Sequence, residues 1–143
     1  RCFVHRETGV NVSPDGLPVC FAPGDGGALF AAATFLADLT DPTLVAPALR
    51  DATAPGPGRD RLLEALDASP DRVRAIGTGA ELRGYKIRTT SPEQVTISLA
   101  LHREDGALGQ VPVTVVRTDG DWKILLPPDG RIGTVGNDEH RAY

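Results

Sequence analysis

The sequence predicts an α+β protein in which N-terminal helices pack inside a strongly curved antiparallel meander sheet, shaped like a half-open cone. Three observations support this fold class. Residues 26–39, GGALFAAATFLADL, are apolar on nearly every side of a helix. After Pro70 the hydrophobic period changes from helical to alternating. After an arm in which Leu17, Val19 and Phe21 predict a short edge strand, the helical segments precede the strands of the meander, an order that favours an α+β layer fold over βαβ units.

The segment 26–39 is the element around which the rest of the chain is expected to pack. A helix that is apolar nearly all round must be buried on most sides. It is also shorter than the ~20 residues that a membrane-spanning helix needs. We therefore expect a core helix that Asp25 caps at its N-terminus. Only Thr34 and Asp38 could contribute to chemistry, and Asp38 is expected in the last, solvated turn.

The 143 residues fit one domain with a substantial core, flanked by two less regular segments. Residues 1–25 are expected to form an extended arm, residues 26–127 the folded domain and residues 128–143 a loose tail. In the arm, Cys2 and Cys20 are candidates for a disulfide that would close a loop of about 19 residues. Two unrelated reduced thiols are the alternative.

Two further helices are expected before the strands. Asp41 and Pro42 are typical of an N-cap and a first helical position, and Pro47 should break or kink the helix near Ala46. In residues 59–68 the leucines share one stripe opposite the charges, which predicts a surface helix.

The second half of the chain carries the strand signals. Residues 73–90 predict a long broken strand region, in which Gly77, Gly79 and Gly84 mark bulges or bends. Residues 94–102 alternate most clearly, with Val95, Ile97, Leu99 and Leu101 predicted to face the core. Two more strands are predicted at 110–117 and 122–126, each preceded by an Asp-Gly turn.

Composition argues against several classes of partner. The net charge of −4 and the pI of about 5.3 provide no field that would attract nucleic acid or an anionic membrane. Seven aromatic residues are too few for a stacking platform on single strands. The cysteines and histidines lack zinc-ligand spacing. We expect no metal, no cofactor and no nucleic-acid partner.

The sequence contains no methionine and begins at Arg1. We expect that a preceding segment, a signal peptide or an N-terminal membrane anchor, has been removed. The domain would then be exported or membrane-anchored and would lie outside the cytoplasm. Membrane contact would be limited to that missing anchor.

No convergent catalytic set emerges, so we expect no enzyme. His102 lies on the polar parity of its strand, and His5 and His140 lie in the terminal segments. If the cone held an enzyme cavity, Tyr85 and Asp38 would be the candidates to line it, although a Tyr half-buried at the core rim is the simpler interpretation. The cationic side chains along the sheet predict a solvated outer face or, alternatively, a surface for a protein partner; they are Arg72, Arg74, Arg83, Lys86, Arg88 and Arg103.

Particular stretches resemble a known superfamily. The closing run DGDWKILL at 119–126, after helices and a curved meander, resembles the nuclear transport factor 2-like (cystatin-like) superfamily. The stretch 15–29 and the run GPGRDRLLEAL at 56–66 resemble actinobacterial membrane-anchored or exported proteins of conjugative elements. Such domains are similar to the extracytoplasmic inner-membrane assembly component of type IV secretion systems.

The resemblance implies a non-catalytic scaffold that binds itself and other subunits of a membrane-associated assembly, and it transfers no site residue. The alternative within the same superfamily is a small-molecule-binding or lyase/isomerase-type enzyme, SnoaL-like or ketosteroid isomerase-like. A deep polar cavity bounded by Tyr85, Asp38 and residues 95–101, with a shifted carboxylate pKa, would favour the enzyme.

Overall fold

The computed structural model describes residues 11–12, 16–68, 81–102, 106 and 108–128 of the chain. Its elements follow one another in the predicted order, with helices before the main sheet, and the α+β fold class is confirmed. They are β1 (Asn11–Val12), β2 (Pro18–Val19), α1 (Asp25–Leu39), α2 (Val45–Asp51), α3 (Pro57–Ala68), β3 (Glu81–Thr90), β4 (Gln94–His102), β5 (Leu108–Thr118) and β6 (Asp121–Leu125).

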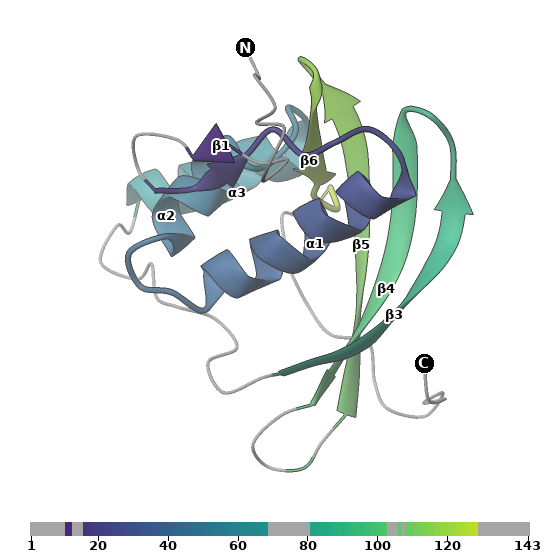
Figure 1. Cartoon of the computed structure of the whole chain (residues 1–143). Coiled ribbons are helices and arrows are strands. Elements are labelled where there is room, and N and C mark those ends of the chain that lie inside the picture. The colour runs from purple at the N-terminus through teal and green to yellow at the C-terminus, as the bar shows by residue number, and fades with distance from the viewer. Residues whose placement is uncertain (1–10, 13–15, 69–80, 103–105, 107, 129–143) are drawn as a thin grey trace.

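The main sheet has four antiparallel strands in the order β3-β4-β5-β6, and it does not close on itself. Figure 1 shows the sheet curving around α1, which crosses its concave face. Alternation sets the faces: Val95, Ile97 and Leu99 of β4 are buried and lie opposite the buried valines of β5 in the register. The inward positions predicted for β4 are therefore confirmed, with Leu101 partly buried at the end of the row.

Helix α1 packs on the sheet through one face only. Ala28, Ala31, Ala32, Phe35 and Leu39 are buried in the core that α1 shares with Trp122, Ile124 and the inner rows of β4 and β5. The opposite face of the helix is exposed, and Phe30 keeps 68% of its surface accessible. The expectation that α1 would be buried on most sides is wrong, because the four-stranded sheet covers it from one side.

The predicted cap of α1 is also wrong. Gly24, with φ of 95°, occupies the N-cap position, and Asp25 is the first residue of the helix. The Asp25 carboxylate instead accepts a hydrogen bond from the Thr90 hydroxyl. This bond joins the start of α1 to the end of β3, so both elements are held at one rim of the sheet.

Helix α2 begins later than predicted. Asp41 accepts bonds from the backbone and the hydroxyl of Thr43, and so caps a turn that precedes the helix. Because α2 starts at Val45, Pro47 lies in its first turn, where a backbone N–H would have no partner within the helix. Pro47 is therefore accommodated at the helix start, and the predicted break near Ala46 does not occur.

Strand β3 forms a free edge of the sheet among the described residues. Its pairing with β4 shifts register between Leu82 and Gly84 and again between Ile87 and Thr89. Arg83 and Arg88 are the extra residues at these two irregularities. The bend predicted at Gly84 is confirmed, whereas Gly77 and Gly79, like Arg72 and Arg74, lie outside the described residues.

The remaining predicted elements match in kind. Helix α3 and strands β4, β5 and β6 fall within two residues of the predicted bounds. In the arm, β1 and β2 form a two-stranded antiparallel ladder. The tail from residue 129 lies outside the described residues, as do His5 and His140. Across the described ranges, no helix combines the length and the apolarity that crossing a membrane requires.

Candidate functional site

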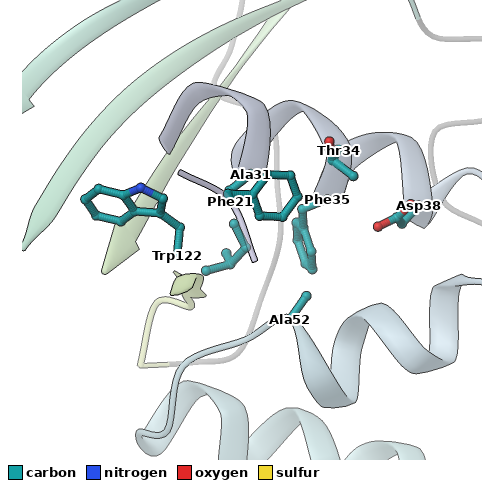
Figure 2. Close-up of a pocket in the computed structure, with 8 residues that line it drawn as sticks. Phe21, Ala31, Thr34, Phe35, Asp38, Ala52 and Trp122 are labelled. Atoms are coloured by element: carbon teal, nitrogen blue, oxygen red, sulfur yellow. The ribbon is translucent and has the colours of Figure 1, made fainter. Parts of the chain in front are cut away.

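A small cavity lies between α1 and the β6 end of the sheet. Its volume is about 10 Å³, and Figure 2 shows Phe21, Phe35 and Trp122 around it with Thr34 and Asp38 on the helix side. A space of this size accommodates at most one water molecule. Substrate sites for small molecules are larger, at roughly 300–1,000 Å³. The cavity can therefore hold a solvent molecule but no organic substrate.

Asp38 is buried at this cavity, with 6% of its surface exposed. Within the described part of the chain, no donor lies within hydrogen-bonding distance of its carboxylate. Burial, with a smaller contribution from the nearby Asp41 carboxylate, raises the pKa of Asp38 to about 6. The expectation of a solvated last turn is wrong, because Asp38 lies on the side of α1 that faces Ala52 and Trp122.

The shifted pKa of Asp38 predicts a pH dependence of stability. The folded state favours the protonated carboxyl relative to the unfolded chain, whose Asp pKa is about 3.9. This contribution is fully present below about pH 4 and is lost as the pH rises through 6. Relative to wild type, Asp38→Asn should therefore gain about 2 kcal/mol between pH 4 and pH 7.5 in urea unfolding.

The matched control for this pH series is Asp41→Asn. Hydrogen bonds from the side chain and backbone of Thr43 lower the pKa of Asp41, so its contribution is lost as the pH falls. The two variants should diverge from wild type in opposite directions across the titration. A difference between Asp38→Asn and wild type that stays constant with pH would contradict the buried, raised-pKa carboxyl.

Tyr85 does not belong to the cavity. It lies on β3 with half of its surface exposed, and the cavity lining contains neither Tyr85 nor any residue of 95–101. In the register Tyr85 lies opposite Leu99, so it is on the concave face of the sheet. However, β3 extends beyond the strands on which α1 packs. The structure therefore does not bring the two enzyme candidates, Tyr85 and Asp38, into one site.

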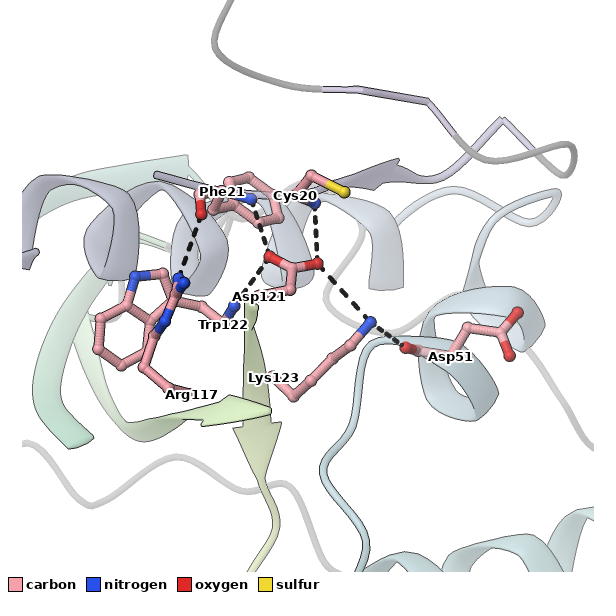
Figure 3. A network of polar contacts seen from close by, with 7 residues as sticks. All are labelled: Cys20, Phe21, Asp51, Arg117, Asp121, Trp122 and Lys123. Carbon is pink, nitrogen blue, oxygen red and sulfur yellow. Dashed lines mark hydrogen bonds and ion pairs between the residues drawn. The ribbon is translucent and has the colours of Figure 1, made fainter. Parts of the chain in front are cut away.

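The carboxylate of Asp121, at the start of β6, is buried and hydrogen-bonded to the backbone at several points. It is 3% exposed and accepts three backbone N–H bonds of 2.8 Å. The donors are Cys20 to Oδ2, and Phe21 and Trp122 to Oδ1 (Figure 3). The carboxylate therefore fixes the end of the arm to the last strand of the sheet.

The neighbours of Asp121 in β6 strengthen the same attachment. The indole N–H of Trp122 donates to the carbonyl of Ala22 at 2.9 Å, and the Arg117 guanidinium lies 5.2 Å from the centre of the Trp122 ring. The Lys123 ammonium lies 3.8 Å from the Asp121 carboxylate and donates to the carbonyl of Asp51 at 2.8 Å. The run Asp121-Trp122-Lys123 thus binds the arm and the end of α2 to β6.

Cys20 is the cysteine that the structure describes. It is buried, it has a positive φ of 67°, and it is disulfide-bonded. Cys2 lies outside the described residues, so its pairing with Cys20 stays a prediction. The disulfide and the Asp121 carboxylate meet at the same backbone segment, which makes this part of the arm the most constrained one described.

Comparison with known proteins gives one result. A family model described as a domain of unknown function (DUF8175) matches residues 6–139. The chain belongs to the DUF8175 family. No curated protein and no solved structure matches it.

The exposed face of α1 is the second notable feature of this DUF8175 domain. No residue between Asp25 and Asp38 is charged, and the positions that turn away from the sheet include Gly26, Phe30 and Ala37. This face therefore exposes uncharged side chains, including the large apolar side chain of Phe30, to solvent. The sequence predicted the apolar character of this helix but not the face that would remain uncovered.

The described part of the DUF8175 domain contains no group of three metal-ligating side chains close enough to share an ion. His102 is partly buried on the β4 strand. The arrangement at Asp121 holds backbone in place through a carboxylate whose acceptor positions are already taken by the protein. The sequence predicted a turn directly before residues 122–126 but not the partners of Asp121, because they lie 100 and 101 positions earlier in the chain.

Proposed function

We propose that this DUF8175 domain is a non-catalytic extracytoplasmic scaffold that joins subunits of a conjugation or type IV secretion-type machine. The observation that carries the proposal is the uncharged outer face of α1 with Phe30 at its centre. Contiguous apolar patches that are exposed to solvent mark surfaces for protein contact. Aromatic residues, Phe among them, are also enriched at the centre of such contacts.

The architecture supports the same role. Three helices precede a curved, open antiparallel sheet in the described residues, as expected for a cystatin-like cone. In this arrangement Phe35 and the alanines of α1 fill the concave face. The cone serves as a rigid support that presents the other face of α1, and the subunits of the machine dock on that face.

The disulfide supports an extracytoplasmic location for the domain. Disulfides persist in oxidising surroundings outside the cytoplasm and are rare in reducing ones. Protein purified without reductant and denatured should contain no titratable thiol, since the sequence has only Cys2 and Cys20. Two free thiols in that titration would overturn the extracytoplasmic assignment.

One observation favours the alternative of a lyase/isomerase-type enzyme, namely the raised pKa of Asp38 beside the Thr34 hydroxyl. A pKa of about 6 suits a general acid or base near neutral pH. The space available to it, about 10 Å³, suits only a water molecule. We therefore treat the raised pKa as a consequence of burial, and the scaffold as the better-supported function.

The test is site-specific photocrosslinking in cells that carry the conjugation machinery. A photoreactive phenylalanine analogue at position 30 should crosslink to other envelope subunits of that machinery, identified by mass spectrometry. The matched control places the analogue at Leu125, which is also exposed but lies on β6. Equal crosslinking at both positions, or none at position 30, would contradict the proposal. Phe30→Ala should remove the contact without loss of stability, because the side chain is already in water.

A further inference from the structure

The two halves of the described chain differ in net charge. The described residues of 16–68 contain seven carboxylates against three arginines, whereas those of 81–128 contain five Lys and Arg residues against four carboxylates. The first region thus has a net charge of −4 and the second +1. The sheet region is therefore slightly basic, although the whole chain is acidic.

The basic surface lies on the outer face of β3. Lys86 pairs with Ser98 in the register, on the side away from the core, and the Arg88 Nε donates to the Ser98 hydroxyl at 3.2 Å. Arg83 forms a 3.0 Å ion pair with Glu81, but no carboxylate in the described ranges lies within ion-pair distance of Lys86 or Arg88. We call Arg83, Lys86 and Arg88 the β3 basic face.

The acidic surface lies on α3. Asp60, Glu64 and Asp67 recur at the spacing that places side chains on one face of a helix, and all three are exposed. Asp67 has only a long contact of 4.0 Å with the exposed Arg50. The stripe spans about 10 Å along the helix, and Lys86 and Arg88 lie about 7 Å apart along their strand, so the two rows have comparable length.

The two surfaces lie at opposite edges of the sheet. Helix α3 begins beside the segment that follows β6, where a Cβ on Gly58 would lie 2.1 Å from the Pro127 carbonyl oxygen. The strand order places β3 at the other edge, and Figure 1 shows α3 and β3 on opposite sides of the molecule. The acidic and basic faces therefore cannot pair within one chain.

We infer that the β3 basic face binds the acidic face of α3 on a second copy of this chain, so that copies associate head to tail. Like surfaces repel each other, which disfavours a twofold contact through either face. A contact between two different surfaces repeats from copy to copy and forms an open row or a ring. The inference goes beyond the proposed function, because it holds whether or not α1 binds another subunit.

The form of β3 favours a helix over a strand as its partner. Arg83 and Arg88 are the extra residues at the two irregularities of the strand. Bulges and charged side chains on an edge strand prevent regular addition of another strand. The cationic side chains nevertheless project outward, where an exposed helix face can meet them. Contacts between exposed charges are weak and are screened by salt, so association should depend on concentration and ionic strength.

The test uses the full purified chain in sedimentation velocity at about 20 mM and about 500 mM salt. Wild type should associate at low salt and dissociate at high salt. K86E/R88E and D60K/E64K should each weaken association about tenfold or more. An equimolar mixture of these two variants should associate again, as should the single chain with all four changes. E93K alters an exposed charge outside both faces and should behave as wild type.

Three outcomes would overturn the inference. Wild type could remain monomeric at low salt, or associate equally well with either face reversed. Alternatively, the β3 basic face could bind polyglutamate or anionic phospholipid vesicles in a K86E/R88E-sensitive manner while wild-type copies do not associate, which would assign it to another partner. Circular dichroism confirms folding of each variant, and the four-change chain keeps the test decisive if one pair of changes unfolds the protein.

Discussion

Replacing Asp121 with alanine should lower the free energy of unfolding by about 3–5 kcal/mol. The substitution leaves three backbone N–H groups without their acceptor, in a region where the carboxylate is 3% exposed. It also leaves the Lys123 ammonium without its carboxylate partner. Urea unfolding without reductant measures the loss, since the Cys20 disulfide must stay intact in both proteins.

Two comparisons make the Asp121 result specific. Asp121→Asn keeps one carbonyl acceptor and the shape of the side chain, so its cost should be intermediate. Asp51→Ala removes an exposed carboxylate from a residue whose backbone carbonyl, not its side chain, binds Lys123, and should change stability by less than about 0.5 kcal/mol. In hydrogen exchange the Cys20 and Phe21 amides should lose protection in Asp121→Ala, while β4 keeps it. A loss of under 1 kcal/mol would mean that the carboxylate does not hold the arm.

Gly27→Ala should destabilise the fold by about 3 kcal/mol or more. A Cβ at Gly27 would lie 1.5 Å from the carbonyl oxygen of Ala22 and 2.5 Å from its carbonyl carbon. These are backbone atoms, so either the arm or the start of α1 must move. Because the same carbonyl accepts the Trp122 indole N–H, the movement should also shift the fluorescence of the single tryptophan.

The neighbouring glycine provides the control. A Cβ at Gly26 would meet no heavy atom within 4 Å, and the residue is helical. Gly26→Ala should therefore be neutral or slightly stabilising, by up to about 1 kcal/mol, and leave the fluorescence unchanged. If the two substitutions had equal effects on stability, the close approach of α1 to the arm would be refuted.

Local sequence patterns predicted the helices and strands but not which neighbouring elements would bury each of their faces. The alternation in β4 was sufficient for both its bounds and its core face, because period two assigns every side chain once one face is buried. The composition of α1 predicted a core helix but did not indicate which face of the helix would be buried. Phe30 and Phe35 look alike in the sequence, yet one is 68% exposed and the other 3%, since the sheet lies on one side.

The polar groups were harder to predict for the same reason. Asp38 follows an apolar run at the end of a helix, where solvent exposure is the usual outcome. Its burial depends on Ala52 and Trp122, which lie far along the chain. Asp121 resembles any turn aspartate until the arm folds against it. In both cases the deciding neighbours are distant in sequence, and local spacing carries no information about them.

The bonds from Asp121 to the arm also limit when the arm can take its final place during folding. They join residues 100 and 101 positions apart, so closing this loop costs considerable chain entropy and cannot occur until β6 has been made. Contacts of such long range slow folding. At a synthesis rate of about 5–20 residues per second, Asp121 is made several seconds after the arm. In a chain that enters a membrane channel N-terminus first, the arm would thus lack its bonds to Asp121 during transit. The final structure would form only after nearly all of the chain has emerged.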